Sequence, residues 1–130
     1  MSSDNLLKYL LIIGGIIEFL LGILFMFLSI LLKQFGRENI PIFTQMAGVF
    51  VFCYGILLIY STKDIEKYLI ILLVNILIRI IVIIFSLLSL FEYPEFSLIL
   101  LFAIPYDLLW SLSIIILLKK SGLIFRRAEK

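Results

Sequence analysis

Residues 68–90 read YLIILLVNILIRIIVIIFSLLSL, a run in which almost every side chain is a large hydrophobic one. A helix needs about 20 mostly apolar residues to cross the hydrocarbon core of a bilayer, and this run has that length. Its many isoleucines would favour a strand in water, but backbone groups in lipid must form their hydrogen bonds within their own segment. The run therefore predicts a membrane-spanning helix.

Three similar runs lie at residues 6–32, 42–60 and 96–118, separated by short polar breaks. Of the 130 residues, 64% are hydrophobic and 15% are charged, whereas a soluble domain has about half apolar and a quarter charged residues. The first run is about twice the length of the apolar core of a cleavable signal peptide, so we expect it to be retained. The predicted fold class is all-α: a polytopic membrane protein whose single domain, residues 1–130, is a bundle of four transmembrane helices.

The distribution of lysine and arginine predicts the orientation of the chain in the membrane. Eight basic residues fall on one predicted side: Lys8, Lys63, Lys67, Lys119, Lys120, Arg126, Arg127 and Lys130. The other side has Lys33 and Arg37, and Arg79 lies within the third run. Because cytoplasmic loops are enriched in lysine and arginine, we predict that the protein is in the cell membrane with both termini cytoplasmic.

The basic C-terminal tail, residues 119–130, interleaves lysine and arginine with Leu123, Ile124 and Phe125. One interpretation is a flank whose long side chains reach the headgroup region and end the fourth span. The other is a site for anionic lipid, at about 1 kcal/mol for each basic residue near the surface. In either case the lipid bilayer is the predicted partner.

Typical helix-boundary residues stand in the polar breaks. Gly36 marks the first connection, and Pro41 suits the first turn of the second helix. Ser61 and Asp64 have the spacing of a capping box that opens the third helix. Residues 92–95, EYPE, predict a tight turn between the third and fourth helices.

Small residues recur along the first two runs at helical spacing. In the first run Gly14, Glu18 and Gly22 stand at every fourth position, with Gly15 adjacent. The second run has heptad spacing: Gln45, Gly48, Phe52 and Gly55. Because small side chains let two helices approach closely in lipid, these positions are predicted to face other helices.

Three ionisable residues lie near the middle of three predicted spans. Glu18, Arg79 and Asp107 each fall within one residue of the midpoint of their run. With a rise of about 1.5 Å per residue they would lie at nearly one depth in the membrane. An unpaired charge there costs about 2.5–3.5 kcal/mol, so we expect the three side chains to face inward and to pair.

This trio has two carboxylates and one guanidinium, so its charges do not balance. Arg79 can form a bidentate pair with one carboxylate, and the shorter Asp107 is the better candidate for a fixed pair. We therefore expect Glu18 to hold a proton or to meet a cation from outside the chain. The alternative interpretation is a static polar cluster that sets the register of the helices.

Four polar or aromatic residues are predicted about one helical turn from the trio, toward the cytoplasmic side. They are Asn75, Tyr54, Trp110 and Ser111. Together with the trio they form the predicted ligand- or proton-binding site. Pro105, two residues before Asp107, either opens a kink that lines a cavity or merely bends the helix.

The composition excludes several other kinds of site. The chain has one cysteine, Cys53, and no histidine, so it has neither an internal disulfide nor the ligands of a zinc or iron–sulfur site. No nucleophile motif is present, Cys53 is expected to be a small packing residue, and no catalytic residue, metal or cofactor is predicted. A net charge of +2 gives no reason to expect nucleic acid as a partner.

Two resemblances to known families follow from short segments. The segment GGIIE, residues 14–18, resembles the first helix of small multidrug resistance transporters, which implies a proton-coupled antiporter that works as a dual-topology dimer. The length, the four spans and the pieces TQMAG (44–48) and DLLW (107–110) are similar to DoxX-like and BphX-like four-span membrane proteins. This second resemblance implies the four-span fold and no particular activity.

Three functions are compatible with these features. The first is a proton- or cation-linked carrier or a small-ligand-binding protein with its site at the trio. The second is an accessory or assembly subunit of a larger membrane complex, and the predicted protein partner is either a second copy of the chain or that complex. The third is a membrane enzyme that acts on a lipid or isoprenoid, with Glu18 and Asp107 as acid and base; it ranks last, so a non-enzymatic function is favoured.

Overall fold

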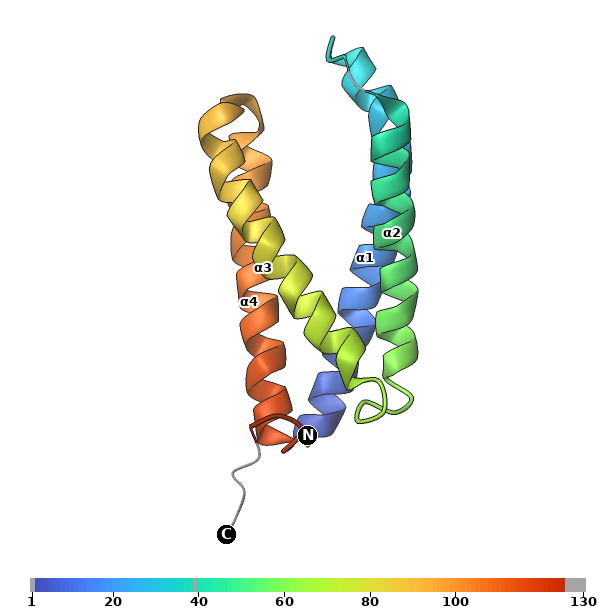
Figure 1. Cartoon of the computed structure of the whole chain (residues 1–130), viewed down its shortest axis with the longest axis vertical. Helices are drawn as coiled ribbons and strands as arrows, with labels where there is room; N and C mark the ends of the chain where they lie inside the picture. The colour runs from blue at the N-terminus through green and yellow to red at the C-terminus, as the bar shows by residue number, and fades with distance from the viewer. Residues whose placement is uncertain (1, 39, 126–130) are drawn as a thin grey trace. The chain divides into compact units, whose positions relative to one another are not determined.

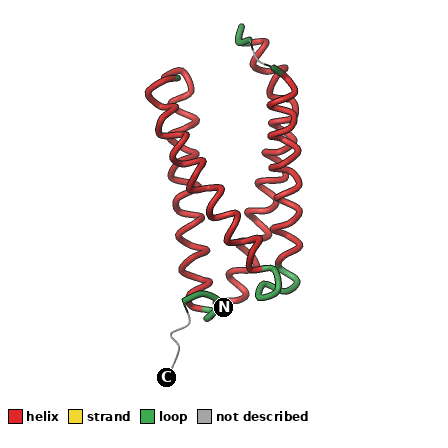
Figure 2. The backbone as a smooth tube through the Cα atoms, viewed as in Figure 1, coloured by secondary structure: helices red, strands yellow, loops and turns green. Residues whose placement is uncertain are grey.

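The structure, a computed structural model, describes residues 2–38 and 40–125, and their regular elements are helical (Figures 1 and 2). They are α1 (Ser3–Gln34), α2 (Pro41–Ser61), α3 (Leu69–Glu92), the short 3₁₀ turn η1 (Pro94–Phe96) and α4 (Ser97–Lys120). Each α-helix is long and apolar enough to cross a membrane. The predicted all-helical class and the four apolar helices are therefore confirmed, and each helix begins and ends within three residues of its predicted limits.

Glycine ends two of the four helices in the same way. After α1, Gly36 has φ of 70°, and the next N–H, that of Arg37, donates to the carbonyl of Leu32 at 2.9 Å. After α4, Gly122 has the same φ and the N–H of Leu123 donates to the carbonyl of Leu118 at 3.0 Å. These are Schellman motifs, in which the left-handed residue is usually glycine because it has no Cβ.

The predicted capping box at the start of the third helix is wrong. The hydroxyl of Ser61 donates to the carbonyl of Leu58 at 2.6 Å, within the last turn of α2. Turns occupy the connection that follows, and α3 begins only at Leu69, with no side-chain hydrogen bond from its N-cap residue, Tyr68. In an apolar helix the nearest acceptor for a serine hydroxyl is the carbonyl of its own preceding turn, which competes with a capping role. The other boundary predictions, Pro41 as the first residue of α2 and a tight turn at 92–95, are confirmed.

The described chain forms two compact units. One, the α3–α4 unit, contains α3, α4 and the beginning of α1 as far as Leu7; the other, the α1–α2 unit, runs from Lys8 to Ile65. Within the α3–α4 unit, the hydroxyl of Ser121 donates to a carboxylate oxygen of Asp4 at 2.5 Å, which fastens the first turn of α1 to the end of α4. The expected single membrane domain remains a prediction.

Glycines form the contact between α1 and α2, which run side by side in Figure 1. A Cβ added at Gly55 would lie 2.6 Å from the carbonyl oxygen of Gly15, and one at Gly48 would lie 2.6 Å from that of Gly22. Both pairs are seven residues apart on each helix, so the two helices are antiparallel with a heptad seam. We call these four glycines the glycine seam; it lets the two backbones touch.

The other predicted packing residues of α2 differ in their burial. Phe52 lies between the two glycine levels, and its ring centroid is 4.4 Å from that of Phe19. Gln45 is exposed, contrary to expectation, because it stands near the end of the span, where a polar side chain gains nothing from burial. Cys53 is also exposed rather than packed, since its position on α2 is off the face that carries the seam.

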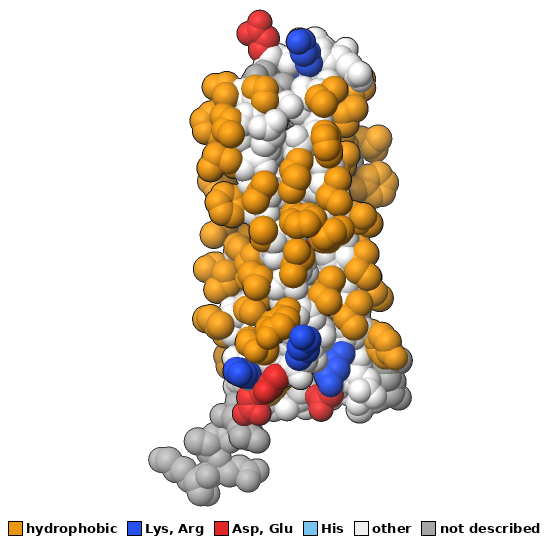
Figure 3. All heavy atoms as spheres, turned by 90° about the vertical axis from the view of Figure 1, so that its right-hand side faces the viewer, with side chains coloured by type: hydrophobic (Ala, Val, Ile, Leu, Met, Phe, Trp, Pro, Cys, Tyr) orange, Lys and Arg blue, Asp and Glu red, His pale blue; other side chains and the backbone are white. Residues whose placement is uncertain are grey.

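The outer surface of the α1–α2 pair is apolar along most of its length. Figure 3 shows hydrophobic side chains over this face and charged side chains at its two ends. Large exposed side chains of this kind, such as Phe43 and Phe50, would be costly in water. This distribution suits a helix pair surrounded by lipid and indicates a multi-pass membrane protein.

The α3–α4 unit has a core of its own. Leu72 and Ile76 of α3 and Ile114 and Leu118 of α4 are buried, and the two helices, joined by η1, pack together and cross at an angle (Figure 1). Of the two interpretations of Pro105, helix continuity favours the milder one, because α4 runs through it without a break. Proline has no N–H to donate to the carbonyl one turn earlier, so the effect on the helix is local.

Candidate functional site

Arg79 is the centre of the polar cluster in the α3–α4 unit. Arg79 is only 5% exposed. Because arginine is almost never buried without partners, it must have polar or aromatic neighbours. Its Nε donates a hydrogen bond of 3.0 Å to the amide oxygen of Asn75, one turn earlier on the same helix. Asn75 is itself buried, so both residues were correctly expected to share an inward face.

Asp107 of α4 completes the charge balance of this cluster. A terminal nitrogen of Arg79 donates to one carboxylate oxygen of Asp107, and the two side chains form an ion pair. Both side chains are largely shielded from solvent. In such surroundings an ion pair is only weakly screened, so this contact holds α3 and α4 in one register.

Two aromatic rings of α4 lie against the guanidinium group. The guanidinium carbon of Arg79 is 4.1 Å from the ring centroid of Trp110 and 5.4 Å from that of Tyr106. Cation–π contacts of this kind are worth about 0.5–2 kcal/mol, and more when the cation is desolvated. The contacts of the cation therefore include a carboxylate, an amide and two aromatic faces.

Two adjacent residues of α4, Trp110 of this cluster and Ser111 after it, each carry a buried polar atom. Neither the indole Nε1 of Trp110 nor the hydroxyl oxygen of Ser111 has a hydrogen-bond partner within residues 2–38 and 40–125. The nearby Ser113 differs, since its hydroxyl donates to the carbonyl of Leu109 at 2.7 Å. A buried polar group without a partner costs about 1–3 kcal/mol, so each of these two atoms would be stabilised by a hydrogen bond with a small polar molecule.

Glu18 and Tyr54 lie together in the α1–α2 unit. Glu18 is buried on α1, between the two levels of the glycine seam, and Tyr54 stands on α2 between the same two levels. A carboxyl at this depth needs a partner or a proton. The expectation that Glu18 joins Arg79 and Asp107 remains a prediction.

The structure thus brings together most of the predicted site residues as two groups. The larger group is the Arg79 cluster in the α3–α4 unit: Asn75, Arg79, Asp107 and Trp110, with the buried Ser111 following Trp110 on α4. The smaller pair is Glu18 with Tyr54. Sequence reasoning missed Tyr106, although its spacing of four from Trp110 places both rings on one face of α4.

Two further findings bear on the chemistry of the chain. Among the described residues, no three or more His, Cys, Asp or Glu side chains are grouped to hold a metal ion. Comparisons of the chain with protein-family models, with curated proteins and with solved structures find no match. The resemblances to small multidrug resistance transporters and to DoxX-like and BphX-like proteins therefore remain predictions.

Proposed function

We propose that this chain is a small carrier or ligand-binding protein of the membrane that takes a small polar ligand at the Arg79 cluster. The observation that carries the proposal is the pair of buried polar atoms on adjacent residues of α4, the indole nitrogen of Trp110 and the hydroxyl of Ser111. A purely structural cluster would need neither atom, because the ion pair with Asp107 already balances the charge of Arg79.

The chemistry of the cluster limits what kind of ligand it takes. The indole N–H is a donor only, and the serine hydroxyl can donate or accept. The ion pair sets a positive and a negative group side by side, so a neutral polar ligand suits the cluster better than a strongly charged one. A small molecule with a hydrogen-bond acceptor, such as a carbonyl or carboxyl oxygen, satisfies both atoms.

Glu18 is the proposed titrating group of the same protein. It is buried. A buried glutamate is either ionised and stabilised by a partner, or protonated and uncharged. A change in its protonation state would alter its interaction with Tyr54 and hence the contact between α1 and α2. This is the proposed source of proton-linked behaviour.

Trp110 is the only tryptophan of the chain, so its emission reports on the cluster directly. The experiment is a fluorescence titration of the protein in nanodiscs, with acetone and acetamide as neutral acceptor probes and with pH from 8 to 5. We expect saturable emission changes for the wild type, a lost probe response for Ser111→Ala, and a lost pH response for Glu18→Gln.

The matched control is Ser113→Ala, which removes a hydroxyl from the same helix that is already hydrogen-bonded. It should keep both responses. A wild-type protein whose emission ignores both probes and pH would overturn the proposal. So would equal losses in Ser111→Ala and Ser113→Ala, because these would reflect a general effect on α4.

The proposed location is the cell membrane, with both termini cytoplasmic. The charge bias of the connections supports this orientation. In a Cys53→Ser background, a cysteine at position 95, between α3 and α4, should react with a membrane-impermeant maleimide added to intact cells. A cysteine at position 64, between α2 and α3, should react only after lysis. The reverse pattern would contradict the orientation.

A further inference from the structure

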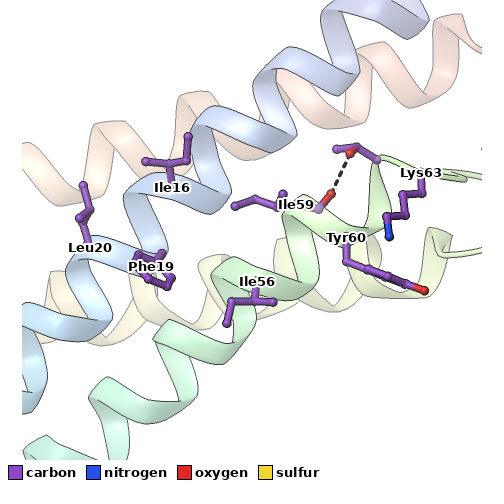
Figure 4. Close-up of a pocket in the computed structure, with 8 residues that line it drawn as sticks. Ile16, Phe19, Leu20, Ile56, Ile59, Tyr60 and Lys63 are labelled. Carbon is purple, nitrogen blue, oxygen red and sulfur yellow. Dashed lines mark hydrogen bonds between the residues drawn. The ribbon is translucent and has the colours of Figure 1, made fainter.

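A groove on the outside of the α1–α2 unit suggests a second site, separate from the Arg79 cluster. It has a volume of about 640 Å³, within the range of about 300–1,000 Å³ that is usual for ligand pockets. Its lining comes from both helices and from the start of the connection after α2: Ile16, Phe19, Leu20, Ile56, Ile59, Tyr60, Thr62 and Lys63 (Figure 4).

Most of this groove is apolar. Ile16 and Leu20 stand on α1 and Ile56 on α2, and all three are exposed side chains that form its walls. Its depth follows from the glycine seam, because the close backbone approach at Gly15 lets Ile59 pack directly on α1. The groove is thus shaped for a hydrocarbon chain.

The polar end of the groove carries a positive charge. Lys63 is the charged residue among the eight that line it, and its ammonium lies 4.5 Å from the ring centroid of Tyr60. This cation–π contact holds the ammonium at the mouth of the groove. The hydroxyl of Thr62 donates to the carbonyl of Ile59 at 2.7 Å, which Figure 4 marks as a dashed line.

The length of the groove matches one leaflet of a bilayer. In the antiparallel register of the glycine seam, Leu20 stands level with residue 50 of α2, and the groove reaches from there to Lys63. The apolar walls run from the level of residue 50 to Tyr60, ten residues or about 15 Å at 1.5 Å per residue, and half the hydrocarbon core is also about 15 Å thick. The apolar part therefore ends where headgroups begin, and there Lys63 stands.

We propose that this groove binds one anionic phospholipid, with an acyl chain along the walls and the headgroup phosphate at Lys63. Charge complementarity at the mouth and the one-leaflet length favour this occupant over a helix of a second copy, which would need a groove along a whole span. The site differs from the predicted lipid contact of the C-terminal tail, and it does not depend on the proposed function.

Native mass spectrometry tests the proposal on the whole chain, released from bilayers of equal parts dioleoylphosphatidylglycerol and dioleoylphosphatidylcholine. We expect the wild type to retain one phosphatidylglycerol preferentially. Lys63→Gln should lower this preference about fivefold, the change that corresponds to about 1 kcal/mol for one basic residue at a membrane surface. Lys67→Gln is the matched control, because Lys67 also lies over a tyrosine, Tyr68, but does not line the groove.

The apolar walls are tested by filling the groove. Ile56→Trp should reduce retention of both lipids, whereas Leu57→Trp, at a neighbouring exposed position outside the groove, should not. If Ile56→Trp does not fold, as judged by circular dichroism, Ile16→Trp fills the opposite wall. Equal effects of Lys63→Gln and Lys67→Gln, equal effects of the two tryptophans, or a dimer that excludes lipid would each overturn the proposal.

Discussion

Arg79 and Asp107, which form an ion pair, are each the eleventh residue of a helix of 24 residues. In an antiparallel helix pair only residues near the middle of both helices lie at similar depth, and the eleventh of 24 positions is close to the middle of each, so the two residues differ in depth by about three residues, or about 4.5 Å. The pair is therefore formed near the middle of both apolar helices, where neither charge can reach water by extending its side chain.

The first prediction concerns this ion pair. Asp107→Asn and Arg79→Gln each remove one partner and leave the other charge buried, so each should lower the free energy of unfolding by about 3–5 kcal/mol. Arg79→Gln combined with Asp107→Asn removes both charges and should cost less than either single change. The measurement is unfolding in SDS followed by circular dichroism. Losses that simply add in the double variant would show that the two side chains are not coupled.

Arg79→Lys is the second prediction, because it keeps the charge and changes the geometry. A lysine ammonium cannot reproduce the bond from Nε to Asn75 while also stacking on Trp110. We expect a loss of about 1–2 kcal/mol in the free energy of unfolding and a changed Trp110 emission spectrum. Lys119→Arg, at the end of α4, is the control and should leave the spectrum unchanged. An unaltered spectrum in Arg79→Lys would argue against the stacked geometry.

The third prediction concerns the glycine seam. Gly→Ala usually stabilises a helix by about 1 kcal/mol, but a Cβ at Gly48 would lie 2.6 Å from a backbone oxygen and a backbone nitrogen of α1. Gly48→Ala should therefore lower the free energy of unfolding by about 1–3 kcal/mol through overpacking. Ala47→Leu adds more volume at the adjacent exposed position and should be tolerated. A stabilised Gly48→Ala protein would contradict the close contact.

Gly36 provides the fourth prediction. No atom lies within 4 Å of a Cβ added there, so its φ of 70° alone determines the effect of a substitution. Gly36→Ala should cost about 1–2 kcal/mol, because a Cβ in the left-handed region meets the following carbonyl. Gly36→Asn should cost less, since asparagine tolerates this conformation. Equal unfolding free energies for the two variants would contradict this account.

Sequence reasoning located the four helices well because each hydrophobic run has one viable structure in lipid. It also placed Arg79 and Asp107 near the middle of their helices, since depth follows from residue number and helical rise alone. It also predicted the buried face of the first helix, since Gly14, Glu18 and Gly22 are all buried. It did not predict that the contact with α2 runs through Gly15 and Gly22, seven residues apart, as antiparallel helices in close contact with a heptad repeat require.

The wrong prediction at Ser61 and the missed contact of Tyr106 both depend on which neighbouring groups a side chain can reach. Ser61 matched a capping pattern, but its hydroxyl bonds to the carbonyl of Leu58 within α2. Tyr106 shares a face of α4 with Trp110, but its contact with Arg79 exists only because α3 and α4 pack at that level. Such contacts depend on which neighbour is within reach, and a pattern along one helix does not contain that information.

The amino-acid sequence by itself determined that this chain forms four apolar helices, because a backbone in hydrocarbon has no other viable arrangement. It also determined that Arg79 and Asp107 stand near the middle of their helices, because the helical rise is constant. Only the tertiary structure decided which atoms meet: Arg79 with Asp107 and Trp110 in one unit, Gly15 with Gly55 and Gly22 with Gly48 in the other. Helix pairing is decided by short-range packing and by hydrogen bonds between side chains, and these depend on the rotation of each helix about its own axis.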